Sequence, residues 1–305
     1  MPPQSVVSGM AAAAADFVLL GHKGFIGSNL LRSLESEGYV VVTSEVLLQD
    51  RASIDSLLDE HKPKLGVIVA AGERGKPNIS WCDSHPVETM DTNVTGQLTV
   101  AASCYHRGIH CTVIGTGALY NCDPSRPEHL FKESDPSNIV APSTYVALRV
   151  KMEELFAYFP NALLLRFNYP TSSDLDPRGI IGKLARFKTV DRSAPSITIM
   201  EDLFPLIPVM VKRKVTGKVN YVNSGGAAFA DIVEALYARA PPGWKGPVVG
   251  DITPQRPTAL LDTSHFAACC GLREIPTAKA SLQRIIASFD SSAIEALIRE
   301  QQSKL

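Results

Sequence analysis

Three glycines near the N-terminus, Gly21, Gly24 and Gly27, constrain the fold of this chain more than any other feature. The apolar run 17–20 stands directly before them and is typical of a buried parallel strand. From the second glycine onward, apolar residues recur at the spacing of a helix, namely Ile26, Leu30, Leu31 and Leu34. A strand, a glycine turn and a helix in this order predict a loop that binds the pyrophosphate of a dinucleotide.

Each of the three glycines has a separate mechanical role in such a loop. Gly21 permits the tight turn, Gly24 lets backbone N–H groups approach a pyrophosphate, and Gly27 lets the helix pack closely on the strand. Phe25 and Ile26 lie inside the loop, so we expect them to contact the same ligand. The spacing G-x-x-G-x-x-G is typical of short-chain dehydrogenase/reductases. The alternative is a glycine turn with a purely structural role.

Strand and helix patterns alternate as far as residue 167. Strands are predicted at 39–43, 65–69, 111–114 and 162–167, and helices at 53–61, about 88–106 and 143–159. Such an alternation predicts the α/β class, with a Rossmann-like, doubly wound parallel sheet.

The domain organisation follows from where this alternation stops. Residues 1–15 are rich in small residues and predict a flexible leader, and 16–167 predict an NAD(P)-binding Rossmann domain. Beyond residue 167 prolines interrupt the pattern, so 168–305 predict a smaller substrate-binding lobe, partly interleaved with the first domain.

Composition excludes several classes of protein. The chain has 30 basic and 31 acidic residues and no long basic run, which argues against nucleic-acid binding. It has no run of the ~18 apolar residues that a membrane span requires. The six cysteines show no metal-ligand spacing, so we expect no metal and interpret them as reduced thiols of a cytoplasmic protein.

The stretch from Gly21 to about Tyr221 contains short motifs that resemble a known family. They are Leu48-Gln49-Asp50-Arg51, Ala70-Ala71-Gly72, Lys76 to His85, Thr92-Asn93-Val94, Phe131-Lys132-Glu133, Tyr145, Glu153-Glu154-Leu155, Ser172 to Leu175 and Lys183. In this order and at these spacings they resemble extended short-chain dehydrogenase/reductases, and among them the nucleotide-rhamnose synthase epimerase/reductases. Arg256-Pro257 with 261–264 looks like the related dTDP-4-dehydrorhamnose reductases.

The resemblance implies a substrate and a chemistry. The substrate would be a nucleotide-linked 4-keto-6-deoxyhexose, and NADP or NAD would supply the hydride that reduces C4. Tyr145 would donate the proton and Thr116 would orient the carbonyl. Further implied cofactor contacts are Ala70, Ala71, Gly72 and Asn93; implied substrate contacts are Asn78, Trp81, Cys82, Thr116, Asn168 and Lys183. From the residues alone, Asn93 could equally lie on the surface, and Trp81 and Cys82 could simply pack their loop.

Two positions depart from the family pattern. Arg149 stands four residues after Tyr145, where the family has the lysine that binds the nicotinamide ribose. Its charge would still stabilise a tyrosinate, but a guanidinium does not deprotonate and cannot relay a proton. Ala118 stands where the family has a cysteine acid/base, leaving Lys183 without its partner unless Cys82 or Cys122 lies nearby. The sequence therefore supports either a working epimerase/reductase or a catalytically impaired NAD(P)-binding regulatory or structural subunit.

Two acidic residues near the second predicted strand bear on the choice of cofactor. Glu45 lies where a carboxylate accepts hydrogen bonds from the ribose of NAD and repels the phosphate of NADP. Lys23 or Arg51 could instead hold that phosphate, so both cofactors stay open. Asp50 resembles the family's adenine-binding aspartate, but it could also cap the helix that follows. A homodimer or a regulatory partner protein is equally compatible with the sequence.

Overall fold

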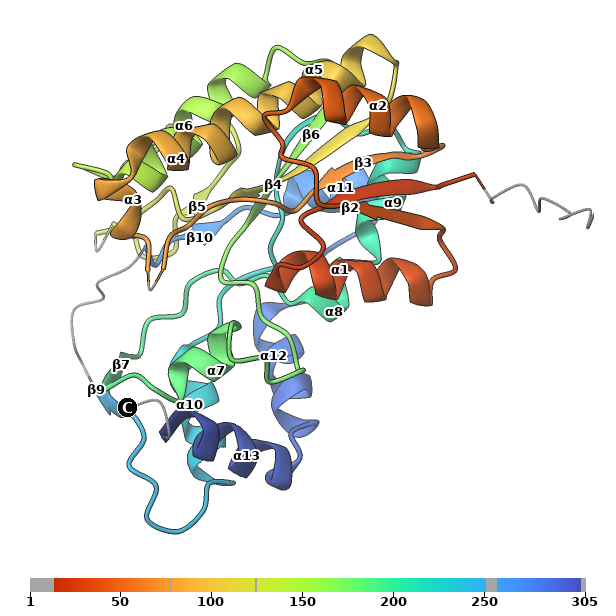
Figure 1. Ribbon diagram of the computed structural model, residues 1–305. Coiled ribbons are helices and arrows are strands. Elements are labelled where there is room, and N and C mark those ends of the chain that lie inside the picture. The colour runs from red at the N-terminus through yellow and green to blue at the C-terminus, as the bar shows by residue number, and fades with distance from the viewer. Residues whose placement is uncertain (1–13, 77, 124, 251–256, 303–305) are drawn as a thin grey trace, which may run out of the picture.

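A parallel six-stranded sheet forms the centre of the computed structural model, which describes residues 14–76, 78–123, 125–250 and 257–302 (Figure 1). Its strand order is β2-β1-β3-β4-β6-β8. The strands are β1 (Phe17–Leu20), β2 (Val41–Ser44), β3 (Gly66–Val69), β4 (Cys111–Thr116), β6 (Ala162–Phe167) and β8 (Gly217–Asn220). The order reverses between β1 and β3, where open α/β sheets bind their ligands. The predicted doubly wound fold is confirmed.

Helices cover both faces of the sheet (Figure 1). One face carries α2 (Arg51–His61), α5 (Gln97–His106) and α6 (Thr144–Phe156); the other carries α1 (Phe25–Ser36), α8 (Met200–Leu203), α9 (Leu206–Lys212) and α11 (Ser264–Cys270). Alternate side chains of β1 enter the two layers, because Phe17 and Leu19 pack toward α1 while Val18 and Leu20 pack toward α2. Burial on both faces explains why the strand reads as an unbroken apolar run.

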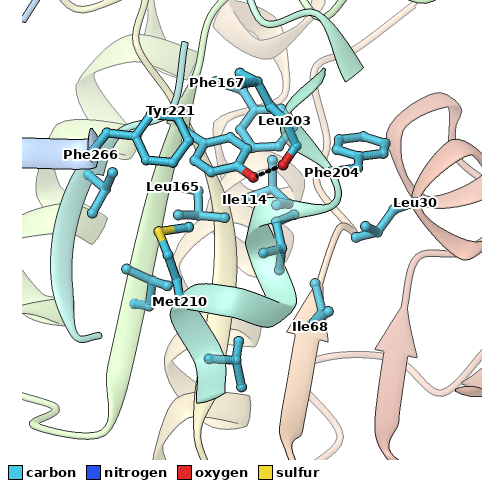
Figure 2. Packing of buried hydrophobic residues seen from close by; sticks show 14 of the residues in the cluster. Leu30, Ile68, Ile114, Leu165, Phe167, Leu203, Phe204, Met210, Tyr221 and Phe266 are labelled. Atoms are coloured by element: carbon cyan, nitrogen blue, oxygen red, sulfur yellow. Dashed lines mark hydrogen bonds between the residues drawn. The ribbon is translucent and has the colours of Figure 1, made fainter. Parts of the chain in front are cut away.

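The layer beneath the sheet is closed by aromatic residues from the second half of the chain (Figure 2). The ring of Tyr221 lies between Phe167 and Phe266, at centroid distances of 5.1 and 4.5 Å. Its buried hydroxyl donates to the carbonyl of Leu203. Residues beyond 168 thus contribute to the core that β1, β6 and α1 form, while the division into two interleaved domains stays a prediction.

A smaller lobe lies below this layer in Figure 1. It contains α7 (Ile180–Leu184), α10 (Phe229–Tyr237), α12 (Ala278–Ala287), α13 (Ser291–Gln302) and the paired strands β7 (Thr189–Asp191) and β9 (Val248–Gly250). These elements share a separate apolar core that includes Phe229, Leu236 and Leu282. A second two-stranded sheet pairs β5 (Leu130–Phe131) with β10 (Leu260–Leu261).

Several predicted boundaries need correction. Residues 1–13 of the expected leader and Arg256 lie outside the described residues, while Ala15 is already buried and its carbonyl accepts from the amide of Lys64. The helix expected at 88–106 is a series of α4 (Pro86–Met90), a π-helical turn η1 (Asp91–Gly96) and α5, preceded by the short α3 (Trp81–Ser84). A π turn differs from the surrounding α-helix by a single inserted residue, so the spacing of apolar residues does not reveal it.

Candidate active site

A cavity of about 470 Å³ opens at the carboxyl ends of β1, β3, β4 and β6. Its wall combines the segments that follow these strands with residues of α6 and α7, so both lobes contribute. Eleven of the residues expected from the sequence line it: Gly24, Phe25, Ile26, Ala70, Ala71, Gly72, Thr116, Tyr145, Arg149, Asn168 and Lys183. Segments far apart in the sequence therefore meet where a ligand is expected in this class of sheet.

The glycine loop between β1 and α1 is shaped by close backbone contacts. Gly21 adopts φ +87°, and a Cβ there would lie 2.4 Å from the amide nitrogen of Ala71. A Cβ on Gly27 would lie 2.2 Å from the carbonyl oxygen of Gly21. At Gly24 a Cβ would meet only that same oxygen, at 3.3 Å. Gly21 and Gly27 are thus required by packing, whereas Gly24 keeps the N-terminus of α1 open to the cavity.

Arg149 is a buried cation beside Tyr145. Its side chain projects from α6, is 5% exposed and donates from Nη1 to Oε1 of Gln97 at 3.0 Å. Its guanidinium carbon lies 5.5 Å from the ring centroid of Tyr145, close enough for a cation–π contact. The neutral Gln97 amide leaves the positive charge directed at the phenol and the cavity.

The loop after β3 is held in place by Asn93, which lies on the π-helical turn and is buried. Its Oδ1 accepts from the amide of Glu73 at 2.9 Å, and its Nδ2 donates to the carbonyl of Glu73 at 2.5 Å. A Cβ on Gly72 would lie 2.8 Å from Nη2 of Arg149. Asn93 is therefore a buried asparagine that fixes this loop, and Gly72 leaves room for the Arg149 guanidinium.

These features fit the chemistry of a nicotinamide dinucleotide. Nε of Arg149 is buried and has no hydrogen-bond partner among the described residues, so it remains free for an acceptor such as a ribose hydroxyl. The N-cap of α1 is Gly24, which provides no side-chain cap, and the first-turn amides can therefore bind a pyrophosphate. The phenol of Tyr145 and the hydroxyl of Thr116, which accepts from the amide of Ala118 at 3.2 Å, lie on the same cavity wall.

Lys183 brings a titratable group from the smaller lobe. It lies on α7, and burial together with the charges of Arg74 and Arg186 lowers its pKa from 10.5 to about 8. The lysine is still mostly protonated at neutral pH, but it releases its proton far more readily than an exposed lysine. Lys183 can thus exchange a proton with a bound ligand.

Sequence reasoning missed three charged residues of the cavity wall, Glu73, Arg74 and Arg178. The first two follow the predicted contact Gly72 directly, so the rule that ligands bind at strand ends could have found them. No comparable signal marked Arg178, whose Nη1 reaches the carbonyl of Lys23 in the glycine loop at 2.9 Å. With Arg149 and Lys183, four basic side chains and one acidic side chain line the cavity among the described residues. Their balance favours an anionic ligand.

Three of the expected substrate contacts are described by the structure but do not line the cavity. Cys82 is 0% exposed, so a substrate cannot reach its thiol. The ring of Trp81 stacks on His85 at 3.9 Å, and Oδ1 of Asn78 accepts from the amide of Ser80 at 2.9 Å. These contacts hold the loop itself, and for Trp81 this is the alternative that the sequence left open. Cys122 also lies outside the wall, so neither cysteine replaces the acid/base that Ala118 lacks.

Two further expected cofactor contacts lie away from the cavity wall, at the side of the sheet next to β2. Glu45 forms an ion pair with Lys23, whose Nζ lies 2.5 Å from Oε1. Asp50 is the N-cap of α2 and accepts from the amide of Ser53 at 3.2 Å and from its hydroxyl at 2.6 Å. The cap is thus observed, and a contact between Asp50 and adenine stays a prediction.

Other kinds of site were sought in the part of the chain that the structure describes. No group of three or more His, Cys, Asp or Glu side chains there is arranged to hold a metal ion. None of the described helices is long and apolar enough to cross a membrane. The six cysteines are all free.

Comparison with known proteins agrees with this geometry. The profile of the NAD dependent epimerase/dehydratase family matches residues 17–162. A bifunctional dTDP-4-dehydrorhamnose 3,5-epimerase/dTDP-4-dehydrorhamnose reductase from Arabidopsis thaliana is 36% identical over 231 residues, which are 74% of this chain and 76% of the relative. A trifunctional UDP-glucose 4,6-dehydratase/UDP-4-keto-6-deoxy-D-glucose 3,5-epimerase/UDP-4-keto-L-rhamnose-reductase from the same plant is 34% identical, and the match covers 76% of this chain but 35% of that relative.

Among solved structures, a UDP-rhamnose synthase from Acanthamoeba polyphaga mimivirus superposes with a TM-score of 0.80 at 24% identity. The match covers 90% of this chain and 99% of that one. At this identity the superposition supports the fold alone. The glycine loop, the parallel sheet and the relative at 36% identity together show that the chain belongs to the NAD-dependent epimerase/dehydratase family.

Proposed function

We propose that this protein binds NADP or NAD and reduces a nucleotide-linked 4-keto-6-deoxyhexose, as in the synthesis of dTDP- or UDP-L-rhamnose. The observation that carries the proposal is the shared cavity of Thr116, Tyr145, Arg149 and Lys183 beside the glycine loop. The names of the rhamnose-forming relatives support the substrate class. The excess of basic side chains on the cavity wall suits the diphosphate of a nucleotide sugar. We place the protein in the cytoplasm, in keeping with its six free thiols.

The proposed reduction divides the work among three side chains. A bound reduced nicotinamide supplies the hydride for C4 of the sugar. Thr116 orients the ketone, and Tyr145 donates its phenolic proton to the oxygen that becomes a hydroxyl. Arg149 stabilises the resulting tyrosinate through its fixed charge, 5.5 Å from the ring. Because a guanidinium does not give up its proton, water must return the proton to Tyr145.

Epimerisation has weaker support from the cavity. The 4-ketone acidifies the protons at C3 and C5, and inversion of either carbon needs one group to remove a proton and another to return it. Lys183, with its pKa of about 8, is suited to one of these roles. Ala118 lines the cavity but has no ionisable group. It stands at the position where the family that this sequence resembles has a cysteine. We therefore expect reduction to be the stronger activity.

The experiment mixes the purified chain with NADPH or NADH and with dTDP- or UDP-4-keto-6-deoxyglucose, and follows loss of reduced nicotinamide absorbance. A second substrate, already epimerised at C3 and C5, tests reduction without epimerisation. Turnover of the second substrate that Tyr145→Phe abolishes would support the proposal. Cofactor binding without turnover of either substrate would contradict it and favour the regulatory or structural subunit. A homodimer or a regulatory partner stays a prediction.

A further inference from the structure

Residues 172–179, in the connection from β6 to α7, lie against α1, and we call them the bridging segment. The hydroxyl of Ser172 donates to Oδ1 of Asn29 at 3.4 Å, and Nη2 of Arg32 lies 3.0 Å from Oδ2 of Asp174. Asn29 and Arg32 are both on α1, the helix whose N-terminus faces the cavity. The bridging segment therefore attaches the smaller lobe to the helix that follows the glycine loop.

Arg178, near the end of the bridging segment, bonds to the glycine loop itself. Its Nη1 donates to the carbonyl of Lys23 at 2.9 Å. Its Nε and Nη2 donate to the carboxylate of Asp176 at 3.0 and 2.7 Å, which holds the guanidinium in one orientation. A planar guanidinium can serve both partners at once, whereas an ammonium does not match this fork. Arg178 thus holds the glycine loop against the smaller lobe, and it also lines the cavity.

The contact continues from Arg178 into α7. Gly179 is the N-cap of α7, and a Cβ there would lie 2.9 Å from Cζ of Phe25, so the ring packs directly on this backbone. The carbonyl of Gly179 accepts from the amide of Lys183 at 3.2 Å, in the first turn of α7. Phe25 and Lys183 both line the cavity. A short path of contacts therefore leads from the loop proposed to bind pyrophosphate to the lysine proposed to face the sugar.

The two proposed ligands would occupy opposite ends of this path. The dinucleotide would bind the amides at the start of α1, and the nucleotide sugar would contact Lys183 from the other lobe. A ligand that fixes the glycine loop also fixes the carbonyl of Lys23, and through Arg178 it fixes the start of α7. The second ligand then meets a lobe that is already ordered, so its own binding costs less conformational entropy.

We infer that Arg178 is a positioning residue that couples the binding of the dinucleotide to the binding of the nucleotide sugar. Each ligand raises the affinity of the cavity for the other, and by the same factor, because the coupling free energy between two sites is reciprocal. The inference rests on the proposed function in that the cavity must bind both ligands, but it does not depend on turnover.

A direct contact between Arg178 and a ligand would act differently. Loss of a direct contact weakens that ligand by the same factor whether or not the other ligand is bound. We define the coupling factor as the dissociation constant of one ligand alone divided by its dissociation constant when the other ligand is bound. Loss of a direct contact leaves this factor unchanged, whereas loss of the positioning role lowers it.

The test measures dissociation constants of the whole chain for UDP-glucose and dTDP-glucose by isothermal titration calorimetry, with and without saturating NADPH or NADH. These sugars carry no 4-ketone, so binding is measured without reduction. The coupling factor of wild type should be about tenfold, and titration of the dinucleotide with and without the sugar nucleotide should return the same value. Arg178→Gln should lower the factor to less than about twofold. Arg178→Lys keeps the charge but not the fork and should give an intermediate factor.

Arg192→Gln is the matched control. Arg192 is an exposed arginine of the same lobe, and its ion pair with Glu234, at 3.5 Å, lies within that lobe. Its loss does not touch the contact between the smaller lobe and the glycine loop, so the coupling factor should equal that of wild type.

The outcomes separate this inference from the proposed function. An Arg178→Gln factor equal to that of wild type would overturn the positioning role, and so would a wild type that binds both ligands without coupling. Either result leaves the proposed function in place. Failure of wild type to bind any of the dinucleotides, or any of the sugar nucleotides, would overturn the proposed function as well. If thermal melts show that Arg178→Gln does not fold, Arg178→Lys decides: a lowered factor supports the role, and a wild-type factor overturns it.

Discussion

The buried ion pair between Glu153 and Arg166 offers the sharpest test of how α6, the helix that carries Tyr145, is held. Glu153 lies on α6, two turns beyond Tyr145, and its side chain is 7% exposed; that of Arg166, on β6, is 3% exposed. Two guanidinium nitrogens of Arg166, Nε and Nη2, approach the carboxylate at 3.0 and 2.6 Å. Nη1 of Arg166 also donates to the hydroxyl of Tyr120 at 3.0 Å. The pair thus joins the helix that carries Tyr145 to the central sheet.

Glu153→Ala would leave the Arg166 cation buried without its counter-ion. Removing one partner of a buried pair costs about 3–5 kcal/mol of unfolding free energy. A loss of that size is a large fraction of the roughly 5–15 kcal/mol by which domains are stable. Urea denaturation followed by circular dichroism should show a much lower midpoint for the variant.

The adjacent residue supplies a matched control. Glu154 lies on the same turn of α6, but it is exposed and pairs with the exposed Lys151 at 2.9 Å. Glu154→Ala should change the midpoint little, because surface pairs contribute little and alanine is a good helix former. Equal losses in the two variants would refute the argument that burial, rather than charge pairing itself, sets the cost. Replacing both Glu153 and Arg166 by apolar residues of similar volume should recover much of the loss.

Two further predictions concern the cavity. Gly24→Asp should abolish cofactor binding, because the new carboxylate would occupy the pyrophosphate position. The fold should survive, because a Cβ there meets only the Gly21 oxygen, at 3.3 Å. Calorimetry and a thermal melt check this, and cofactor binding equal to that of wild type would contradict the assigned loop. Lys183→Met should raise the melting temperature at pH 7, because burial and the charges of Arg74 and Arg186 disfavour the Lys183 ammonium. Since the folded pKa of about 8 lies below the unfolded value of 10.5, wild type should gain stability relative to Lys183→Met as pH rises between these values. A gap between the two melting temperatures that stays constant from pH 7 to 10 would show that Lys183 is not perturbed.

Much of the fold could be predicted because its signals are local. The strand at 17–20 and the strand at 162–167 were predicted with the bounds that the structure has, since both are continuous apolar runs. The second strand was predicted to begin at residue 39, two residues before β2 begins. The cause is Tyr39, an apolar residue that precedes β2 and packs edge-on against Phe17. The strands β5 and β10 were missed, because two-residue strands carry no periodicity.

The candidate site divides in the same way. Thr116 and Gly72 were assigned to the site by resemblance, and the structure places both on the cavity wall, because the topology brings parallel strand ends to one edge. Asn78 and Trp81 were assigned to the substrate by resemblance, but the structure pairs them within their own loop. Arg178 was missed because its approach to the glycine loop depends on the placement of the smaller lobe.

By itself, the sequence determined the glycine loop, the parallel sheet and the pair Tyr145 and Arg149, because each of these follows from apolar periodicity, glycine spacing or separation along one helix. The tertiary structure alone decided that Lys183 is a partly buried lysine beside Arg74, that Lys23 neutralises Glu45, and that Cys82 is out of reach. The physical reason is that charge and burial depend on neighbours distant in the chain, and those neighbours meet only after the sheet and both lobes have packed.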